Sequence, residues 1–387
     1  MSAAAPLGGR IFTRGLFTLL GIGGVAVAIL AYRLFKGLGP VTGMNDGYPW
    51  GIWIAFDVVT GTGIACGGYA VALLVYIFNR GRYHPLVRPA LLSSALGYTV
   101  AGLSVFVDIG RWWNAWKVPL FWKWNFSSVL LEVALCIMTY MVVAWVEVSH
   151  SMLAKWNRDE KYPLLTAISR RVSPMLERAL PFLIALGLLL PTMHQSSLGS
   201  LFLVSTKLHP LWHTRLLQLL FLVSVAGMGY AGVVLESTVT GFAFKLDSEW
   251  KLLGKLSLAI SISFFAYLAI RLTALAVNGF PGFGWNGLSA LFIAELLLFF
   301  IPAVLLSFAR NRARPGMLFF CAMLALLAGA TYRFDTFLVA FDPGPGWHYF
   351  PSIPEMLVTI GFVAFEVAGF VIVVKLFPIL RPARSST

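Results

Sequence analysis

Apolar residues along this chain form long continuous runs, separated by short stretches rich in Gly, Pro, Asn and charged residues. Each run is about 20 residues or longer, the length that an α-helix needs to cross a bilayer. The pattern predicts spans at residues 15–36, 50–79, 86–111, 126–149, 179–198, 211–239, 252–277, 286–309, 316–341 and 353–378. We therefore expect an all-α integral membrane protein with about ten transmembrane helices, forming a single polytopic domain over residues 1–387.

The composition agrees with this pattern. Of 387 residues, 59% are hydrophobic and 12% are charged, and the mean hydropathy is +0.82. A soluble domain carries about 25% charged residues. The net charge of +13 lies in the segments between the spans. This basic character therefore does not indicate a nucleic-acid partner.

The distribution of Lys and Arg predicts the orientation of the chain. An even number of spans places both termini on one side, together with most of the 29 basic residues, chiefly in 80–88, 155–178, 245–255, 310–314 and 375–384. The opposite side carries far fewer, namely Arg33, Lys36, Arg111, Lys117, Lys123, Lys207 and Arg215. Because positively charged loops stay in the cytoplasm, we expect cytoplasmic termini and a cytoplasmic loop over 149–178.

The cysteines and histidines do not form cofactor motifs. Cys66, Cys136 and Cys321 each lie alone inside an apolar run, without the spacings of iron–sulfur or haem-attachment motifs. The six histidines do not form the pairs at a common depth on facing helices that a membrane b-type haem requires. We therefore expect no haem, no iron–sulfur cluster and no metal site in this chain.

The most unusual span begins with GYPWGIWIAFDVVTGTGIACGGYA, residues 47–70. Asp57 lies about one and a half turns inside the apolar run, and small residues follow on the same helical face at Gly61, Ala65 and Gly68. A carboxylate in hydrocarbon must face protein, water or a ligand. The small residues admit a neighbouring helix or a flat ring. A Gly-lined helix contact with a paired Asp57 is the structural alternative.

Other ionisable residues also lie inside the predicted spans. Toward the side opposite the termini are Asp108, Glu132, His194, Arg271, Arg333 and Asp335; Glu295 and Glu366 lie near mid-depth, and Glu236 and Glu147 near the cytoplasmic ends. This distribution suits proton transfer in short steps, for which the candidates are Glu132, Glu236, Glu295, Glu366, Asp335 and Arg333. Structural alternatives are an Asp108–Arg111 pair and neutralisation of Asp335 by Arg333 or Arg271.

Asp57, Glu132 and His194, beside an apolar Gly-lined wall, would suit a quinone. The carbonyl oxygens of a quinone need polar partners and proton donors as quinol forms, and its tail needs an apolar groove. His194 follows Pro191, where we expect the helix to be broken; a capping histidine is the alternative. We expect these three residues to protonate the quinone and to bind it together with Trp50, Gly61, Asp108 and Arg111.

The loops on the side opposite the termini are rich in aromatic residues, Pro and Gly, as in DIGRWWNAWKVPLFWKW and DPGPGWHYFPSIPE. Aromatic residues concentrate at membrane interfaces, but an interfacial belt does not explain the Gly-Pro turns. We therefore favour a surface on which a partner docks.

These segments identify a family. PWGIWIAFDVVTGTGIACGGYA, NRGRYHPLVRPALL, VDIGRWWN, LLPTMHQSSLGSL, KLHPLW and FDPGPGWHYFP closely resemble the HybB-type, cytochrome-b-like membrane subunit of periplasmic nickel–iron uptake hydrogenases, within the polysulfide reductase/NrfD-like family. The resemblance implies two four-helix bundles, spans 2–5 (about 50–198) and spans 6–9 (about 211–341), flanked by helices at about 15–36 and 353–378. It also implies no haem, and a quinone site near the outer face of the first bundle.

On this resemblance we expect the quinone-reactive subunit of a membrane-bound hydrogen:quinone oxidoreductase in a bacterial inner membrane. Its partners would be a periplasmic ferredoxin-like iron–sulfur subunit, the small and large subunits of a nickel–iron hydrogenase, and lipid. Its substrate would be menaquinone or another quinone, with protons passing from the cytoplasm through Glu236 and Glu132, which match acids of the family. The alternatives are a quinone subunit of a polysulfide, nitrite or molybdopterin enzyme, and a stand-alone proton-linked transporter.

Overall fold

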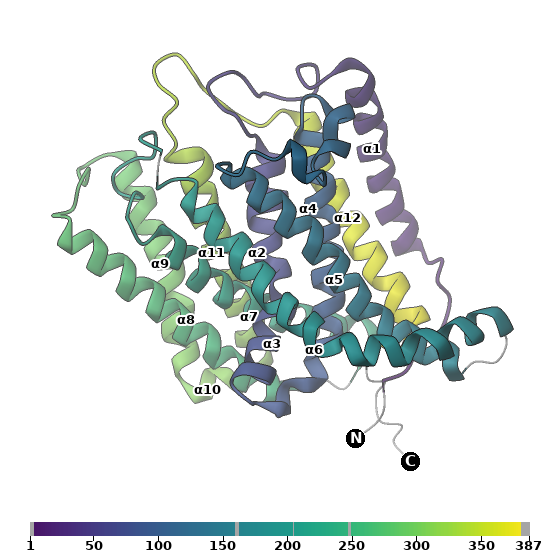
Figure 1. Ribbon diagram of the computed structural model, residues 1–387. Coiled ribbons are helices and arrows are strands. Elements are labelled where there is room, and N and C mark those ends of the chain that lie inside the picture. Colours follow the sequence, from purple (N-terminus) through teal and green to yellow (C-terminus); the bar gives the residue numbers. More distant parts are fainter. Residues whose placement is uncertain (1–3, 159–161, 204, 247–248, 381–387) are drawn as a thin grey trace.

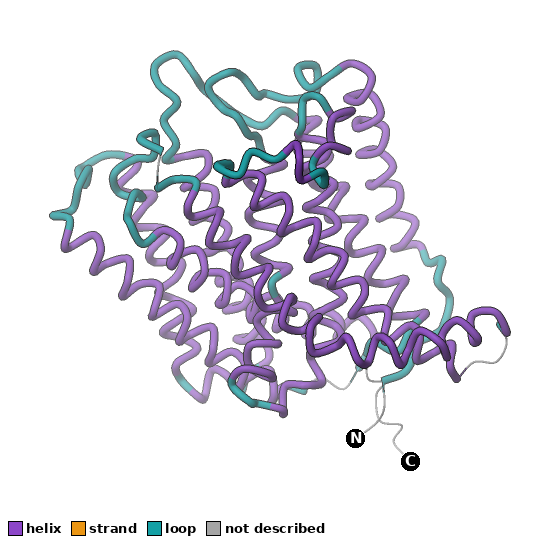
Figure 2. The backbone as a smooth tube through the Cα atoms, viewed as in Figure 1, coloured by secondary structure: helices purple, strands orange, loops and turns teal. Residues whose placement is uncertain are grey.

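The computed structural model describes residues 4–158, 162–203, 205–246 and 249–380. Within these ranges the chain contains no strand, and 10 helical segments are long and apolar enough to cross a membrane. The segments run side by side (Figure 1), and long connections gather at one end of the molecule (Figure 2). The prediction of an all-α membrane protein with about ten spans is confirmed.

The helices follow the apolar runs closely. The second span is irregular and is assembled from four short pieces, whereas the others are single helices or a helix with a short extension. In chain order the elements are α1 (Arg14–Lys36), η1 (Trp53–Thr60), α2 (Gly61–Ala65), α3 (Gly67–Ala72), η2 (Leu73–Ile77), η3 (Gly81–Leu86), α4 (Val87–Asp108), η4 (Trp112–Lys117), η5 (Phe121–Lys123), α5 (Val129–Arg158), α6 (Pro163–Ser200), α7 (Leu217–Phe244), α8 (Trp250–Val277), α9 (Gly287–Ser307), α10 (Ala309–Arg312), α11 (Pro315–Phe334), η6 (Asp335–Val339) and α12 (Ile353–Leu376).

The two ends of the molecule differ. The Ala5 N–H donates to the Leu380 carbonyl at 3.1 Å and the Leu7 N–H donates to the Val374 carbonyl at 3.2 Å, so the two ends of the described chain meet. We call this end the terminal side. The opposite end, which we call the loop side, carries the long connections 37–52, 109–128 and 340–352 (Figure 2).

Helix packing forms two groups that share the second span. On one side α4 packs against the pieces of the second span and against α5, and α5 packs along α6. On the other side α7, α8, α9 and α11 contact one another in turn, and α11 closes the ring against α7. The second span joins the groups, because α2 and α3 contact α7 and η1 contacts α11. Outside the first group, α12 packs against α1, α4 and η1.

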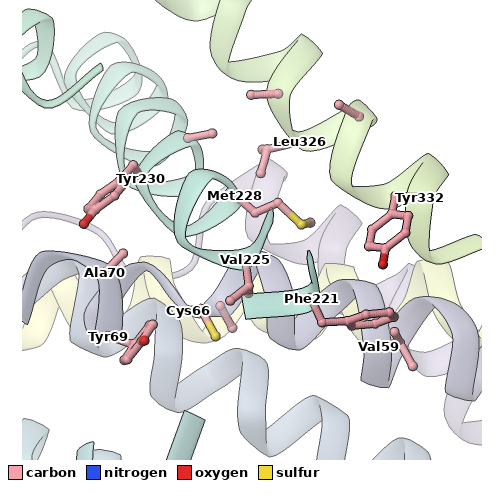
Figure 3. Close-up of a cluster of buried hydrophobic side chains, with 14 of the residues drawn as sticks. Val59, Cys66, Tyr69, Ala70, Phe221, Val225, Met228, Tyr230, Leu326 and Tyr332 are labelled. Atoms are coloured by element: carbon pink, nitrogen blue, oxygen red, sulfur yellow. The ribbon is translucent and has the colours of Figure 1, made fainter. Parts of the chain in front are cut away.

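The missing side chain of Gly229 permits a close approach between α7 and the second span. A Cβ atom at Gly229 of α7 would lie 2.6 Å from the Cys66 carbonyl oxygen and 2.9 Å from the Ala70 Cβ. Side chains from the second span, α7 and α11 point into one buried cluster at this contact, including Cys66, Val225 and Met228 (Figure 3). Small residues allow helices in a membrane to gain dispersion energy by close packing.

The expectation that residues 149–178 form a loop is wrong. α5 continues to Arg158 and α6 begins at Pro163, so most of this segment is helical. At 38 residues α6 is about 57 Å long, well beyond the roughly 30 Å hydrocarbon core. Its first part runs across the terminal side at a steep angle to the other helices (Figure 1). Hydropathy marks only the part of a helix that lies in lipid, which is why the sequence pattern ended these spans early.

Side-chain hydrogen bonds explain why α5 and α6 stay helical there. The Ser169 hydroxyl donates to the Leu153 carbonyl at 2.7 Å, and the Asn157 amide donates to the Ser173 hydroxyl at 3.1 Å. Ser169, Ser173 and Leu176 follow at helical spacing and face α5, while Ile168, Val172 and Met175 are exposed.

The Gly229 contact generates the first prediction. Gly229→Ala places a methyl group against the Cys66 carbonyl and should destabilise the protein by about 1–3 kcal/mol, the usual effect of overpacking. The measurement is the midpoint of thermal unfolding in detergent. Gly24→Ala in α1 is the matched control, because a Cβ at Gly24 meets no atom within 4 Å. Equal midpoints for the two variants would contradict close packing at Gly229.

Candidate functional site

The second span has unusual backbone geometry around Asp57. η1, which contains Asp57, and η2 are π-helical, so their backbone hydrogen bonds reach one residue further than in an α-helix. The Thr60 hydroxyl donates to the Ala55 carbonyl, five residues back, at 2.9 Å. Such widened turns are frequent at functional sites. They also shift the faces on which η1 and α2 present their side chains.

One face of the second span looks toward α4 and α12. Asp57 is 3% exposed and accepts a hydrogen bond at Oδ2 from the Thr359 hydroxyl of α12, at 3.1 Å. Further along, Ala65 lies against Gly97 and the Gly68 N–H donates to the Ser94 hydroxyl at 3.0 Å, so α4 fills the small-residue stripe. A Cβ at Gly61 would meet no neighbouring helix within 4 Å. A helix, rather than a ring, therefore occupies the stripe at Ala65 and Gly68.

Two further acids lie along the same face of α4. The Ser93 hydroxyl of α4 donates to Glu236 Oε2 of α7 at 2.8 Å. One turn along, a Cβ at Gly97 would lie 3.3 Å from Glu366 Oε1 of α12. Glu366 is close enough to interact electrostatically with both Glu236 and Asp57.

These three carboxyl groups form a buried series that we call the α4 acid line: Glu236, Glu366 and Asp57. Two serines of α4 mark the ends of the line: Ser93 contacts Glu236, and Ser104 lies beside Asp57. These serines are 11 residues apart, so the line extends for about 16 Å along α4. It begins at a cavity of about 90 Å³ on the terminal side, which Glu236 lines. Glu236 Oε1 is buried without a hydrogen-bond partner, so water from this cavity would satisfy it.

The other face of the second span holds His194. His194 of α6 is fully buried, and its Nε2 lies 2.9 Å from the Thr62 hydroxyl. That hydroxyl donates to the Val58 carbonyl and accepts from the Gln195 amide at 3.0 Å. Because Thr62 has a single hydroxyl proton, His194 Nε2 must be the donor to Thr62. His194 Nδ1 is therefore the basic nitrogen, and it is buried without a partner.

Arg333 of α11 completes this network from the second helix group. Its guanidinium donates to Gln195 Oε1 at 3.2 Å, to the Val59 carbonyl at 3.0 Å, and to Gly329 and Ser224 of the second group. Among the residues that the structure describes, no carboxylate pairs with it. Hydrogen bonds to carbonyl and amide oxygens stabilise the buried charge instead.

A second polar cluster lies inside the ring of α7, α8, α9 and α11. Glu295 is fully buried and accepts hydrogen bonds from Trp212 and Tyr267, each at 2.8 Å. Arg271 donates to the Trp212 carbonyl at 3.1 Å and lies within electrostatic range of Glu295 and Asp335. Of the two arginines considered for Asp335, the structure thus places Arg271, and not Arg333, as the compensating charge.

The remaining predicted site residues lie apart from Asp57 and His194. Glu132 is exposed in the first turn of α5. Arg111 is exposed just after α4, and Arg33, rather than Arg111, lies beside Asp108. Trp50 is buried among Phe202, Phe337 and Phe341 and donates to the Phe337 carbonyl at 2.9 Å. The structure does not bring Asp57, Glu132 and His194 into one pocket.

α6 is continuous through His194, so the expected helix break there is wrong. Pro191 leaves the Gly187 carbonyl without its usual donor, but the helix continues to Ser200. The Thr192 hydroxyl donates to the Leu188 carbonyl at 2.8 Å and is in hydrogen-bond contact with the Tyr69 hydroxyl at 3.1 Å, which supports the helix at this point. Ser and Thr side chains commonly support Pro-containing membrane helices in this way.

Sequence reasoning missed several residues that hold the site. Thr62, Ser93 and Thr359 carry hydroxyl groups inside apolar runs, which give no pattern of their own. Glu355 accepts from the Gly43 N–H, the Ser352 N–H and the Tyr349 hydroxyl, and it ties the loop 340–352 to the entrance of the second span. The capping sequence Ser352-Ile-Pro-Glu355 was the available signal.

The fold and its intramembrane network define a polytopic helical membrane protein with buried proton-exchanging groups. The family model described as "Polysulphide reductase, NrfD" matches residues 40–340. The chain belongs to this family, as the resemblance implied.

Three individual proteins are similar to this chain in sequence. The chain is 40% identical over 98% of its length, and 96% of the relative's, to the probable Ni/Fe-hydrogenase 2 b-type cytochrome subunit of Escherichia coli (strain K12). It is 34% identical over 44% of its length, and 39% of the relative's, to the integral membrane subunit of menaquinone reductase from Nitratidesulfovibrio vulgaris. A selenate reductase subunit of Mesobacillus selenatarsenatis is 28% identical over 25% of this chain and 24% of its own.

The name of the Escherichia coli relative corrects one expectation. That protein is named a b-type cytochrome subunit, and b-type cytochromes bind haem, so the expectation of a chain without haem is contradicted. His194 is the one histidine that is fully buried among the described residues, and no group of three or more His, Cys, Asp or Glu there could hold a metal ion. These residues do not fit a haem held by two histidines, and no step below passes through haem.

The His194 network generates the second prediction. Thr62→Val removes the hydroxyl that His194 Nε2 and the Gln195 amide both use, and should cost about 1–3 kcal/mol because two buried donors lose their partner. Thr62→Ser keeps the hydroxyl and is the matched control. The measurement is again the unfolding midpoint in detergent. A Thr62→Val protein as stable as Thr62→Ser would show that Thr62 does not hold His194 and Gln195.

Proposed function

We propose that this chain is the quinone-reactive membrane subunit of a hydrogen:quinone oxidoreductase. Electrons would come from a nickel–iron hydrogenase through a ferredoxin-like iron–sulfur subunit that docks on the loop side. Menaquinone, or another quinone, would be reduced near the loop-side end of the first helix group. The two relatives named as a hydrogenase subunit and as a menaquinone reductase subunit support this assignment.

The observation that carries the proposal is the α4 acid line. Carboxyl groups inside membrane spans that pair with no cation are candidates for a functional role. Glu236, Glu366 and Asp57 extend from a cavity on the terminal side toward the loop side. Quinone reduction consumes two protons with its two electrons, and this line would bring protons toward the ring. Glu132, Glu295, Asp335 and Arg333 remain proposed members of the wider proton path.

Asp57 is the proposed proton donor at the end of this line. Its carboxyl group is held by the Thr359 hydroxyl at one oxygen, and its helix has the widened turns described above. A carboxyl group in such a site can give its proton to a quinone oxygen as the electrons arrive and then be reloaded from Glu366. Trp50, Gly61, Asp108, Arg111, Glu132 and His194 complete the proposed quinone-binding set.

The loop side supplies the proposed docking surface. Trp113, Trp116 and Trp122 of the loop 109–128 are all more than half exposed. Aromatic side chains are enriched at the centres of protein interfaces, where they supply large contact areas with little loss of conformational freedom. An iron–sulfur subunit bound here would lie on the same side as the end of the α4 acid line.

The proposed orientation of the protein in the membrane rests on the distribution of its basic residues. Among the described residues, basic segments lie on the terminal side, in the η3 turn, in the last turns of α5, in the first part of α6 and around α10. The positive-inside rule then places the terminal side in the cytoplasm and the loop side in the periplasm. We propose a bacterial inner-membrane location in this orientation.

A quinone subunit serving another oxidoreductase is the second candidate. The likeness to a selenate reductase subunit, over a quarter of the chain, favours it over a stand-alone transporter. The two candidates share the quinone chemistry and differ only in the electron-donating partner. Hydrogenase subunits that copurify with the chain would decide for the first candidate.

Asp57 provides the third prediction. Asp57→Asn removes the exchangeable proton but keeps a hydrogen-bond acceptor for Thr359, so quinone reduction by hydrogen should slow by about tenfold or more. Hydrogen oxidation with a soluble artificial acceptor should be unchanged, because it bypasses this subunit. Asp46→Asn, in an exposed loop, is the control. Wild-type quinone turnover in Asp57→Asn would remove Asp57 from the mechanism.

The docking surface provides the fourth prediction. Trp113→Ala combined with Trp116→Ala should weaken the proposed contact, since aromatic anchors typically contribute about 2 kcal/mol or more each when buried in an interface. The measurement is the amount of hydrogenase retained when the complex is purified through this chain. Phe242→Ala removes an exposed aromatic side chain from the terminal side and is the control. Unchanged retention in the double variant would place the partner elsewhere.

A further inference from the structure

A second cavity, separate from the one at which the α4 acid line begins, opens on the terminal side of the first helix group. It measures about 180 Å³ and lies between the second span, α4, α5 and α6. Its lining is rich in groups that exchange protons or bind water: Tyr69, Tyr76, His84, Tyr140, Glu147 and His150. The sequence alone places Glu147 near the cytoplasmic end of its span, without indicating a cavity there.

The cavity is deep relative to the membrane. His84 and Tyr76, at its mouth, are exposed, whereas Tyr69 and Tyr140, at its inner end, are buried. Tyr140 and Ser151, which both line it, are 11 residues apart on α5, a distance of about 16 Å along the helix. That is about half of a 30 Å hydrocarbon core.

A short series of side chains joins the inner end to His194. The Tyr140 ring contacts the Tyr98 ring, with centroids 4.4 Å apart, and the Tyr98 ring contacts the His194 ring at 5.8 Å. In parallel, the hydroxyl of Tyr69, which lines the cavity, lies 3.1 Å from the hydroxyl of Thr192, two residues before His194 on α6. His194 therefore lies one layer of side chains beyond the cavity.

Unsatisfied nitrogens at both ends of this series indicate water. His150 Nδ1, where α5 lines the cavity, and His194 Nδ1, beyond its inner end, are both buried without a hydrogen-bond partner. Buried polar atoms are almost always hydrogen-bonded, to protein or to ordered water. The walls of the cavity are mainly apolar, and Glu147, His150 and the tyrosines are the groups that could hold water there. The cavity has room for several water molecules, but it is smaller than the roughly 300–1,000 Å³ of pockets that hold drug-sized ligands.

We propose that this cavity is a water-filled inlet that carries protons from the terminal side to His194 Nδ1. Glu147 and His150 would exchange protons with water in the cavity. The Tyr140 and Tyr98 layer separates that water from His194, and a proton would cross it when water or a hydroxyl group bridges the gap. The inlet reaches the opposite face of the second span from the α4 acid line.

The role of the inlet rests on the proposed function. Reduction of a quinone by two electrons from the iron–sulfur partner takes up two protons, one at each carbonyl oxygen. The α4 acid line ends at Asp57 and the inlet ends at His194, so each would deliver protons by its own path. The presence of water in the cavity is independent of this function and is tested separately.

The first test measures access to the cavity. Ala72 lines it, and the three native cysteines are buried, so Ala72→Cys should react from the terminal side with a small charged thiol reagent. Ala144→Cys, buried one turn from Tyr140 and outside the lining, is the control. In inverted membrane vesicles of the assembled complex, we expect labelling of Ala72→Cys about tenfold faster, because thiol reactivity follows exposure to water. Equal rates would overturn the inlet.

The second test measures proton delivery. Glu147→Gln should slow proton uptake and quinone turnover by about tenfold, since a proton-exchanging group is lost, while activity with a soluble acceptor is kept. Tyr140→Phe, which keeps the ring and removes the hydroxyl, should do the same. Glu177→Gln, exposed on α6, is the control.

The outcomes separate this proposal from the proposed function. Normal turnover in Glu147→Gln and Tyr140→Phe, with slow turnover in Asp57→Asn, would overturn the inlet and leave the proposed function standing. If Asp57→Asn is also normal and no quinone is reduced by the complex, the proposed function fails. Slow turnover in the Glu147 and Tyr140 variants with rapid labelling of Ala72→Cys would support the inlet.

Discussion

The structure depends on one irregular helix packed on both faces. The second span is tightly packed at three of its glycines. A Cβ atom added there would lie closer to a neighbouring side chain than ordinary van der Waals contact allows: Gly63 against Arg333, Gly67 against Val233 and Gly68 against Ser94. Close packing of this kind replaces the hydrophobic effect as the force that holds helices together in lipid. Because both helix groups press on this span, any shift in it would disturb Asp57 on one face and Thr62 on the other.

Arg333 and Arg271, the two buried arginines nearest the candidate site, are compensated in different ways. The Arg333 side chain reaches from α11 to the second span, where carbonyl and amide oxygens stabilise its charge. In the same network His194 donates from Nε2 to Thr62, so Nδ1 is its basic nitrogen. Arg271 instead serves the carboxyl groups of the second helix group. The α4 acid line has no such cation among the described residues. Its carboxyl groups are consequently the ones that can gain or lose a proton without breaking an ion pair.

The sequence predicted the architecture well because hydropathy reports directly on the membrane. Span number and positions followed from run length, and the family followed from long motifs. The pattern failed where helices leave the lipid, as in 149–178, since an amphipathic extension lacks a continuous apolar run. It also failed at Pro191, where Thr192 supports the helix through hydroxyl hydrogen bonds that periodicity does not reveal.

The candidate site was predicted in part. The sequence singled out Asp57, His194, Glu236 and Glu366 as intramembrane ionisable groups, but it placed Asp57 and His194 together. That grouping rested on the similar depth of the two residues, and depth does not show that Asp57 faces α12 while His194 lies on the opposite face of the second span. Partners such as Thr359 and Thr62 come from contacts across helices distant in sequence, which a single sequence without side-chain geometry does not contain.

Placing proton-exchanging groups on two faces of one span has a consequence for energy coupling. A continuous column of water through the first helix group would let protons leak across the membrane. Here the cavity on one face ends at the Tyr140 and Tyr98 layer, and the acid line on the other consists of separate carboxyl groups joined only through neighbouring side chains. Under the proposed function, protons would then move only as each group is vacated in turn. Arrival of electrons at a quinone on the loop side would vacate the last group, so that electron transfer itself would draw protons from the terminal side.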